Sequence, residues 1–177
     1  KVTGNVKFDT SLPSLDSADI EHLRSLLGLE PQRPVIVAGS IHPEEYSCIL
    51  QAFALLRRNG SRPFLLLAPR ELKDAQAALA AAEKMVPDSR SARRTAMNDN
   101  APSCGPPDIV VLDTQGELKF FYSLATVAVV GGSFAASRGG HNLLEPASFA
   151  KPVIVGPNMD NFSSIVDIFT RAKGILQ

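Results

Sequence analysis

Four glycines within ten residues precede a segment with a helical pattern, and this combination can bind an anion. Glycine has no Cβ, so the backbone N–H groups of such a loop can approach a ligand closely. The glycines are Gly131, Gly132, Gly139 and Gly140. The pattern after them predicts a helix over residues 142–150, whose free N–H groups carry a partial positive charge of about half a unit. Glu145 lies one turn inside that helix, where a carboxylate either stabilises the helix or accepts hydrogen bonds from vicinal ribose hydroxyls. The glycine spacing matches neither the dinucleotide-binding fingerprint nor the P-loop.

Three further loops carry polar residues suited to chemistry. Arg70 follows Pro69 at the end of an apolar run, where a guanidinium is a ready partner for a phosphate or carboxylate and is otherwise exposed charge. His42 and His141 are candidate general acids or local hydrogen-bonding groups. Ser40 lacks the G-x-S-x-G context and a His–Asp partner set, so it is not interpreted as a nucleophile.

The fourth candidate is Thr114-Gln115-Gly116-Glu117, which matches the S/T-x-x-E capping box and predicts a helix over residues 114–125. A helix-capping role is sufficient to explain a glutamate at position 117. Two cysteines 56 residues apart and three histidines give no metal-ligand spacing, and no DxD-like motif is present. We therefore expect no catalytic metal and no cofactor.

Short runs of Val, Ile and Leu alternate with helix-length amphipathic stretches. Runs of this kind without polar alternation are typical of strands buried on both faces of a parallel sheet. The runs are residues 35–38, 64–68, 109–112, 127–130 and 153–155, with a weaker candidate at 4–8. The predicted helices are residues 16–27, 43–59, 71–86, 114–125, 142–150 and 161–172.

This order predicts a three-layer α/β sandwich with five or six parallel strands. Since ligands of such sheets bind beyond the carboxyl ends of the strands, all four polar loops should share one edge. Residues 88–107 interrupt the alternation and are interpreted as a long surface loop with one short strand near residues 92–95.

Composition narrows the function class. The chain has 177 residues, which suits one domain, and 18 basic residues balance 18 acidic ones. A zero net charge and the absence of Trp argue against a nucleic-acid partner. No apolar run is long enough to span a membrane and no secretion signal opens the sequence, so we expect this part to be soluble, with free thiols.

Taken together, the motifs resemble one family. In chain order they are Gly4-Asn5-Val6-Lys7-Phe8-Asp9, Gly39-Ser40-Ile41-His42-Pro43-Glu44-Glu45, Ala68-Pro69-Arg70, Asp113-Thr114-Gln115-Gly116-Glu117-Leu118, Gly131-Gly132-Ser133-Phe134, Gly139-Gly140-His141-Asn142-Leu143-Leu144-Glu145-Pro146 and Gly156-Pro157. The chain is similar to the C-terminal half of the 3-deoxy-D-manno-octulosonic acid (Kdo) transferases of lipopolysaccharide synthesis. Two positions depart from the family pattern: Glu71-Leu72 stand where His-Pro is frequent, and Ile41 replaces a threonine.

The resemblance implies a glycosyltransferase-B fold, in which two Rossmann-like domains face a cleft. Residues 1–177 would form the C-terminal domain, truncated at its C-terminal end, which binds the donor CMP-Kdo. The general base, the lipid A precursor site and the membrane-associating surface would lie in the absent N-terminal half, at the cytoplasmic face of the bacterial inner membrane. This part alone should be inactive and should contain no catalytic residue.

The resemblance also assigns donor contacts. CMP would contact Pro69, Arg70, Gln115, Gly116, Glu117, Asn142, Leu143, Leu144 and Glu145. Further donor contacts would come from Ser40, His42, Gly139, Gly140 and His141. Two alternatives remain open: a UDP-sugar glycosyltransferase or UDP-sugar 2-epimerase domain, and a flavodoxin-like interaction module without a ligand.

Overall fold

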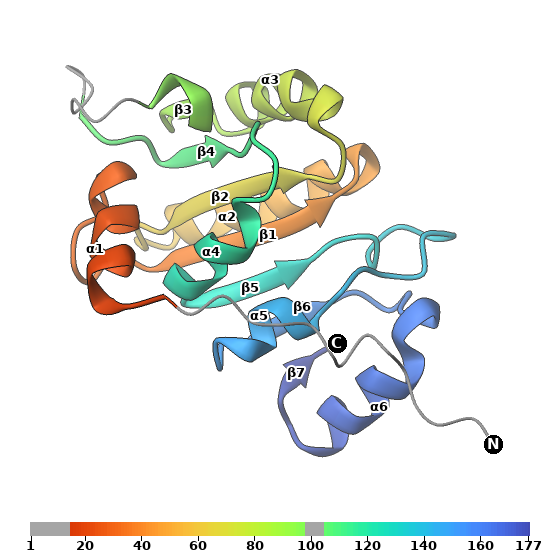
Figure 1. The fold of residues 1–177 in the computed structure, drawn as a ribbon. Helices are drawn as coiled ribbons and strands as arrows, with labels where there is room; N and C mark the ends of the chain where they lie inside the picture. The colour runs from red at the N-terminus through yellow and green to blue at the C-terminus, as the bar shows by residue number, and fades with distance from the viewer. Residues whose placement is uncertain (1–14, 98–104) are drawn as a thin grey trace.

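Seven parallel strands form one sheet in the computed structural model, which describes residues 15–97 and 105–177 (Figure 1). The strand order is β3-β4-β2-β1-β5-β6-β7, and every neighbouring pair is parallel. The strands are β1 (Val35–Ile41), β2 (Phe64–Pro69), β3 (Ser91–Arg93), β4 (Ile109–Val111), β5 (Val127–Val130), β6 (Val153–Val155) and β7 (Ile175–Leu176). The α/β class and the parallel sheet are confirmed, whereas the expected number of five or six strands is wrong. The weak strand candidate at residues 4–8 lies outside the described residues.

Six α-helices connect these strands, several of them preceded by a 3-10 turn. They are α1 (Ser17–Leu26), α2 (Tyr46–Arg58), α3 (Ala75–Met85), α4 (Leu118–Phe121), α5 (Leu144–Ser148) and α6 (Ser163–Arg171). The 3-10 turns are η2 (Pro43–Glu45), η3 (Leu72–Asp74), η4 (Arg94–Ala96), η5 (Tyr122–Leu124) and η6 (Asp160–Phe162). The first of the α-helices begins with a reciprocal capping box between Asp16 and Asp19.

Two of the predicted helices are much shorter than expected. The Thr114 hydroxyl bonds the Glu117 carboxylate instead of a backbone N–H group, so the expected capping box is not formed and α4 begins only at Leu118. Helix α5 has five residues, with Leu143 at its N-cap, and Glu145 lies in its first turn. The helix cannot continue through Ala150, because the φ angle of this residue is +53°.

Within residues 88–107, the short strand expected near residues 92–95 is confirmed as β3, whereas the interpretation of the segment as a surface loop is wrong where it reaches the core. Strand β3 pairs with β4 along its whole length, and η4 follows it directly. Met97 comes next and is only 8% exposed, because it packs into the core with Val110 and Leu112. The excursion therefore supplies an edge strand and a core side chain.

Alternate strand residues point to the two faces of the sheet, and helices cover both. Val35 and Val37 of β1 pack in the core under α1 and the α4–η5 segment, whereas Ala38 packs in the core under α2 and α3. All six residues of β2 are buried. A smaller cluster joins β6 to α6 through Val153, Val155 and Ile165. Burial on both faces explains why the strand sequences show no polar alternation.

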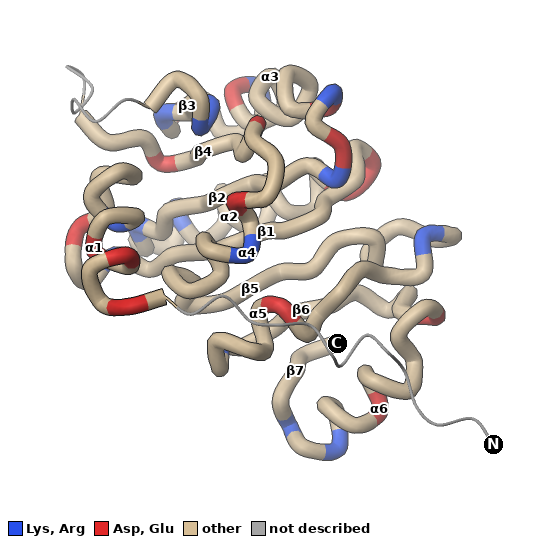
Figure 2. The backbone as a smooth tube through the Cα atoms, viewed as in Figure 1, with Lys and Arg blue, Asp and Glu red and all other residues tan. Residues whose placement is uncertain are grey.

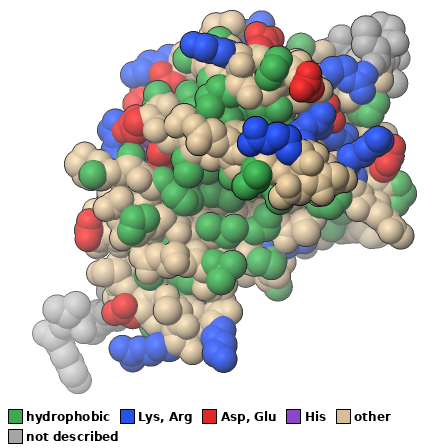
Figure 3. All heavy atoms as spheres, turned by 180° about the vertical axis from the view of Figure 1, so that it is seen from behind, with side chains coloured by type: hydrophobic (Ala, Val, Ile, Leu, Met, Phe, Trp, Pro, Cys, Tyr) green, Lys and Arg blue, Asp and Glu red, His purple; other side chains and the backbone are tan. Residues whose placement is uncertain are grey.

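Charged residues lie on the helices and loops, while the central strands carry none (Figure 2). The face seen from behind mixes apolar and charged side chains (Figure 3). Among the described residues, none of the helices is long and apolar enough to cross a membrane. Cys48 is a free, exposed thiol, as expected, and Cys104 lies outside the described residues.

Candidate functional site

The sheet has a switch point between β1 and β5. The chain runs outward from β1 through β2 to β4 and β3 on one side, and it returns to β5 on the other side. The loops that leave β1 and β5 therefore diverge at the carboxyl edge, which is where open α/β sheets bind their ligands. All the loops singled out in the sequence lie along this edge, because every strand is parallel.

A buried carboxylate joins the two loops at the switch point. Glu45 is 2% exposed, and its oxygens accept hydrogen bonds from the backbone N–H groups of His42, Gly132 and Phe134, each at 2.9 Å. Three charge-assisted bonds satisfy a group whose burial would otherwise be costly. Glu45 therefore fixes the glycine-rich loop after β5 against the loop after β1. The sequence alone does not reveal this role, since a glutamate after Pro43 also fits the first turn of a helix.

The glycines allow these loops to approach one another. A Cβ on Gly131 would lie 2.3 Å from the Ser40 carbonyl oxygen, and one on Gly132 would lie 2.7 Å from the His141 ring. The φ angles of Gly132 and Ser40 are +68° and +57°, so both residues adopt the left-handed conformation at this junction.

Most of the glycine N–H groups are already occupied. That of Gly131 donates to the Gly39 carbonyl at 2.9 Å, that of Gly140 to the Gly132 carbonyl at 2.7 Å, and that of Gly132 to Glu45. The backbone N–H groups of these three glycines are therefore not available to bind an anion, contrary to expectation. Gly139 and Gly140 instead give room to Asn161 and Met159, whose side chains a Cβ would overlap.

The two candidate histidines meet at the centre of the site. Their Nε2 atoms are 2.8 Å apart, and the rings are stacked with centroids 5.1 Å apart. The Nε2–H group of one ring therefore donates a hydrogen bond to the Nε2 atom of the other. Burial, together with the positive charge of Arg70, lowers the pKa of His141 from 6.5 to about 4, so His141 is neutral at pH 7.

The stability of the fold should fall as the pH is lowered from about 6.5 toward 4, because His141 binds its proton more weakly in the folded chain than in the unfolded chain. Allowing for the solvent screening of this half-buried ring, we expect a loss of about 1 kcal/mol between pH 7 and pH 5. Thermal melting at both pH values measures it. His141→Gln should reduce the pH dependence, whereas His22→Gln on the exposed side of α1 should not. An equal slope in all three proteins would contradict the assignment.

Arg70 presents a free guanidinium beside this pair. Its backbone N–H donates to the Ile41 carbonyl at 2.9 Å, which ties the end of β2 to the end of β1. Its side chain is exposed and has no hydrogen bond or ion pair with any residue of the described part of the chain. Pro69 is buried as the last residue of β2. Arg70 can therefore take an anion at the edge of the sheet.

Glu145 lies on the opposite side of the switch point from Arg70. The Asn142 side chain donates to the Glu145 carboxylate at 3.3 Å and accepts the N–H of Leu144 at 3.1 Å. Leu143 is fully buried and its side chain packs in the core, while its expected contact with the donor stays a prediction. Burial raises the pKa of the Tyr122 hydroxyl, and the nearby negative charge of Glu145 raises it further. Glu145 on α5 is therefore half-buried and lies near Tyr122.

The loop after β4 is held on the β3 side of the sheet. Arg94 of η4 donates to the Glu117 carboxylate at 3.1 Å, and the Thr114 hydroxyl bonds the same carboxylate. Gly116 has a φ of +82° with open space around it, and Gln115 is exposed. The structure thus brings His42, His141, Arg70 and the glycine loop together, while residues 115–117 stand further along the same edge. Within residues 15–97 and 105–177, no group of acidic, His or Cys side chains could hold a metal ion.

A parallel sheet with polar loops converging at a switch point defines a Rossmann-like α/β domain. No family model matches the chain. Among characterised proteins, it is 38% identical over 165 residues to the 3-deoxy-D-manno-octulosonic acid transferase of Bordetella pertussis, a match that covers 91% of this chain and 36% of the relative. The transferase of Haemophilus influenzae is 33% identical over 178 residues, with 99% of this chain and 39% of the relative covered.

The fold is also that of a solved domain. The crystal structure of the C-terminal CMP-Kdo binding domain of WaaA from Acinetobacter baumannii aligns with a TM-score of 0.77 and 30% identity, covering 91% of this chain and 82% of that one. The chain belongs to the family of 3-deoxy-D-manno-octulosonic acid transferases. It spans little more than a third of the length of the curated relatives.

Proposed function

We propose that residues 1–177 are the C-terminal, donor-binding domain of a Kdo transferase and bind CMP-Kdo at the carboxyl edge of the sheet. The observation that carries the proposal is the alignment of 91% of this chain with a CMP-Kdo binding domain. The loops that resemble the family's nucleotide contacts all lie at that edge of this chain.

The free guanidinium of Arg70 supplies the positive charge for the CMP phosphate. In the transfer reaction, an acceptor hydroxyl attacks the anomeric carbon of Kdo and CMP leaves with the bonding electrons. Negative charge then grows on the departing phosphate, and a preorganised cation beside it lowers the barrier. Glu145 on α5 accepts hydrogen bonds from the vicinal ribose hydroxyls. Gln115, Gly116 and Glu117 lie further along the edge, where they contact the rest of the nucleotide.

The remaining parts of the reaction belong to a second domain. A glycosyltransferase-B cleft has two walls, and this chain supplies one of them. The general base, the site of the lipid A precursor and the contact with the inner membrane are assigned to the other wall. The proposed domain therefore binds the donor but does not transfer Kdo alone.

Calorimetric titration of this chain with CMP, UMP and CMP-Kdo tests the proposal. We expect CMP and CMP-Kdo to bind and UMP to bind at least tenfold more weakly, which corresponds to a difference of about 1.4 kcal/mol in binding free energy. Preference for UMP would favour a UDP-sugar enzyme. The absence of any nucleotide binding would leave the interaction module as the better interpretation.

A further inference from the structure

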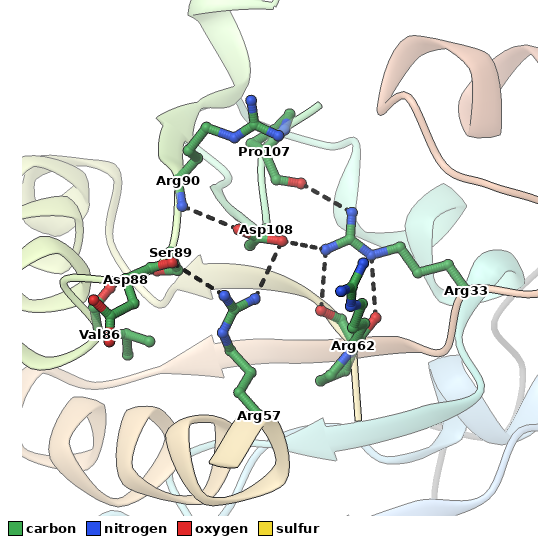
Figure 4. A network of polar contacts seen from close by, with 10 residues as sticks. Arg33, Arg57, Arg62, Val86, Asp88, Ser89, Arg90, Pro107 and Asp108 are labelled. Carbon is green, nitrogen blue, oxygen red and sulfur yellow. Dashed lines mark hydrogen bonds and ion pairs between the residues drawn. The ribbon is translucent and has the colours of Figure 1, made fainter. Parts of the chain in front are cut away.

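The two edges of the sheet differ in how their charged groups are paired. At the amino edge, Asp108 Oδ1 lies 2.5 Å from Arg33 Nη2 and 3.2 Å from Arg57 Nη1 (Figure 4). The Arg33 guanidinium also donates to three backbone carbonyls, so this network joins the amino ends of the strands. At the carboxyl edge, the central polar groups are instead two histidines and an arginine without a carboxylate partner, which points to a role beyond structure.

One carboxylate brings His42 and His141 together. Glu45 accepts the backbone N–H of His42 and also those of Gly132 and Phe134, so it joins the loops that carry the two rings. The glycine-rich loop lies close to His141, because a Cβ on Gly132 would be 2.7 Å from its ring. The separation of 2.8 Å between the two Nε2 atoms is therefore determined by the packing of both loops.

This contact limits where the hydrogens of the two rings can lie. One hydrogen lies between the Nε2 atoms, since two N–H groups would repel each other and two bare nitrogens would not bond. When both rings are neutral, one Nδ1 atom therefore carries a hydrogen and the other has a free lone pair. A proton taken up at that lone pair gives the pair one positive charge and makes the bond between the rings charge-assisted. The pair can therefore gain a charge while its rings stay in place.

The charges around the pair are balanced except for one. Within the described part of the chain, the charged side chains that face the rings are Arg70, Arg138, Glu44, Glu45 and Glu71. Glu44 pairs with Arg138 at 2.7 Å, and Glu71 pairs with Lys73 at 2.6 Å. Glu45 is occupied by three backbone N–H groups, so Arg70 is left uncompensated. Burial and then the charge of Arg70 lower the pKa of His141 to about 4, which keeps this ring neutral in the free site.

We propose that the His42–His141 pair takes up a proton from solvent when a nucleotide phosphate binds at Arg70, and so becomes the second cation of the donor site. The inference rests on the proposed function, which places the CMP phosphate at Arg70. A phosphate monoester carries about −1.5 to −2 units of charge, so it more than cancels the charge of Arg70 and leaves negative charge beside the rings. Such a neighbour favours the protonated form of an imidazole.

Proton uptake of this kind matches the charge that develops in the transfer reaction. When the anomeric C–O bond breaks, its electron pair goes to the phosphate, whose charge grows from about −1 toward −2. A pair that binds its proton in response to this growth adds a positive charge where Arg70 alone would leave an excess of negative charge. Because the pair is neutral before the phosphate arrives, it does not repel Arg70 in the free domain.

The test follows the ring Cε1–H NMR signals of the histidines from about pH 4 to pH 8, in this chain alone and saturated with CMP. We expect CMP to raise the titration midpoint of His141 by about one unit or more. A rise of one unit means about tenfold tighter binding of CMP to the protonated pair than to the neutral pair. The midpoint of His22, which is exposed on α1, should not move. Cytidine has the same base and ribose without the charge, and it should leave the midpoint of His141 unchanged.

A pair of matched variants checks the part played by Arg70. Arg70→Gln removes the positive charge beside the ring, so it should raise the midpoint of His141 in the free chain. Arg58→Gln removes an exposed arginine at the end of α2 and should leave that midpoint where it is. Equal midpoints in the two variants would contradict the coupling between Arg70 and the histidine pair.

Binding itself is followed in the same samples through the backbone amide signals of Gly116 and Asn142. If CMP shifts these signals but not the midpoint of His141, the inference is wrong and the proposed function stands. If CMP shifts no amide signal at the carboxyl edge, both are wrong. An equal rise of the midpoint with cytidine would also overturn the inference, since the phosphate charge would not be its cause.

Discussion

Replacing Glu45 with glutamine should lower the free energy of unfolding by about 2–4 kcal/mol and weaken CMP binding with it. The glutamine amide has one oxygen for the three backbone N–H groups that Glu45 satisfies, and its NH₂ group would face a donor. Each buried donor left without a partner costs about 1–3 kcal/mol. Denaturant unfolding and CMP titration on the same protein measure both effects.

Glu44 is the matched control, since it is the neighbouring residue of the same type. It forms an exposed ion pair with Arg138 at 2.7 Å, and such pairs contribute about 0–1 kcal/mol. Glu44→Gln should therefore leave stability and CMP affinity nearly unchanged. If Glu45→Gln were as stable as Glu44→Gln, the three backbone bonds would not hold the two loops together.

Replacing Glu145 with glutamine should weaken CMP binding tenfold to a hundredfold, or about 1–3 kcal/mol. In the proposed complex the carboxylate accepts hydrogen bonds from two ribose hydroxyls, and a neutral amide with one oxygen makes weaker hydrogen bonds. Calorimetric titration with CMP measures the loss, and a melting curve of the same variant separates binding from stability.

The competing role for Glu145 is local. A carboxylate in the first turn of α5 stabilises the helix by a few tenths to about 1 kcal/mol. A variant that melts at a lower temperature but binds CMP with unchanged affinity would leave only this role. Glu83→Gln on the exposed side of α3 should change neither quantity.

Strong local patterns predicted the frame of this domain. The runs that became β1, β2, β4, β5 and β6 contain consecutive apolar residues, because helices cover both faces of the sheet. Strand β3 has three residues and was expected only as a short strand near residues 92–95, and β7 has two residues, Ile175 and Leu176, which are too few to predict a strand. Their pairing depends on the edges that β4 and β6 offer, which local patterns do not reveal.

The site was predicted less completely, because its contacts are long-range. Glu45 bonds Gly132 across 87 residues, and a local pattern contains no sign of that partner. The capping box failed for a similar reason: the Thr114 hydroxyl finds the Glu117 carboxylate, while Arg94 from the β3 side holds the same group. Loop positions followed from the order of strands, but the partners of each side chain did not.

The pairing of β1 with β5 has a consequence for how the domain folds. Ile36 lies against Val127 at the switch point, so this pairing closes a loop of about 90 residues, whereas β1 and β2 pair across fewer than 30. Loop-closure entropy therefore favours early association of the first half of the sheet and delays the docking of β5, β6 and β7. The candidate site spans this junction and is complete only after the two halves have joined. The proposed binding of a nucleotide is therefore acquired at a late stage of folding, and amide exchange in the last three strands would report when it is lost.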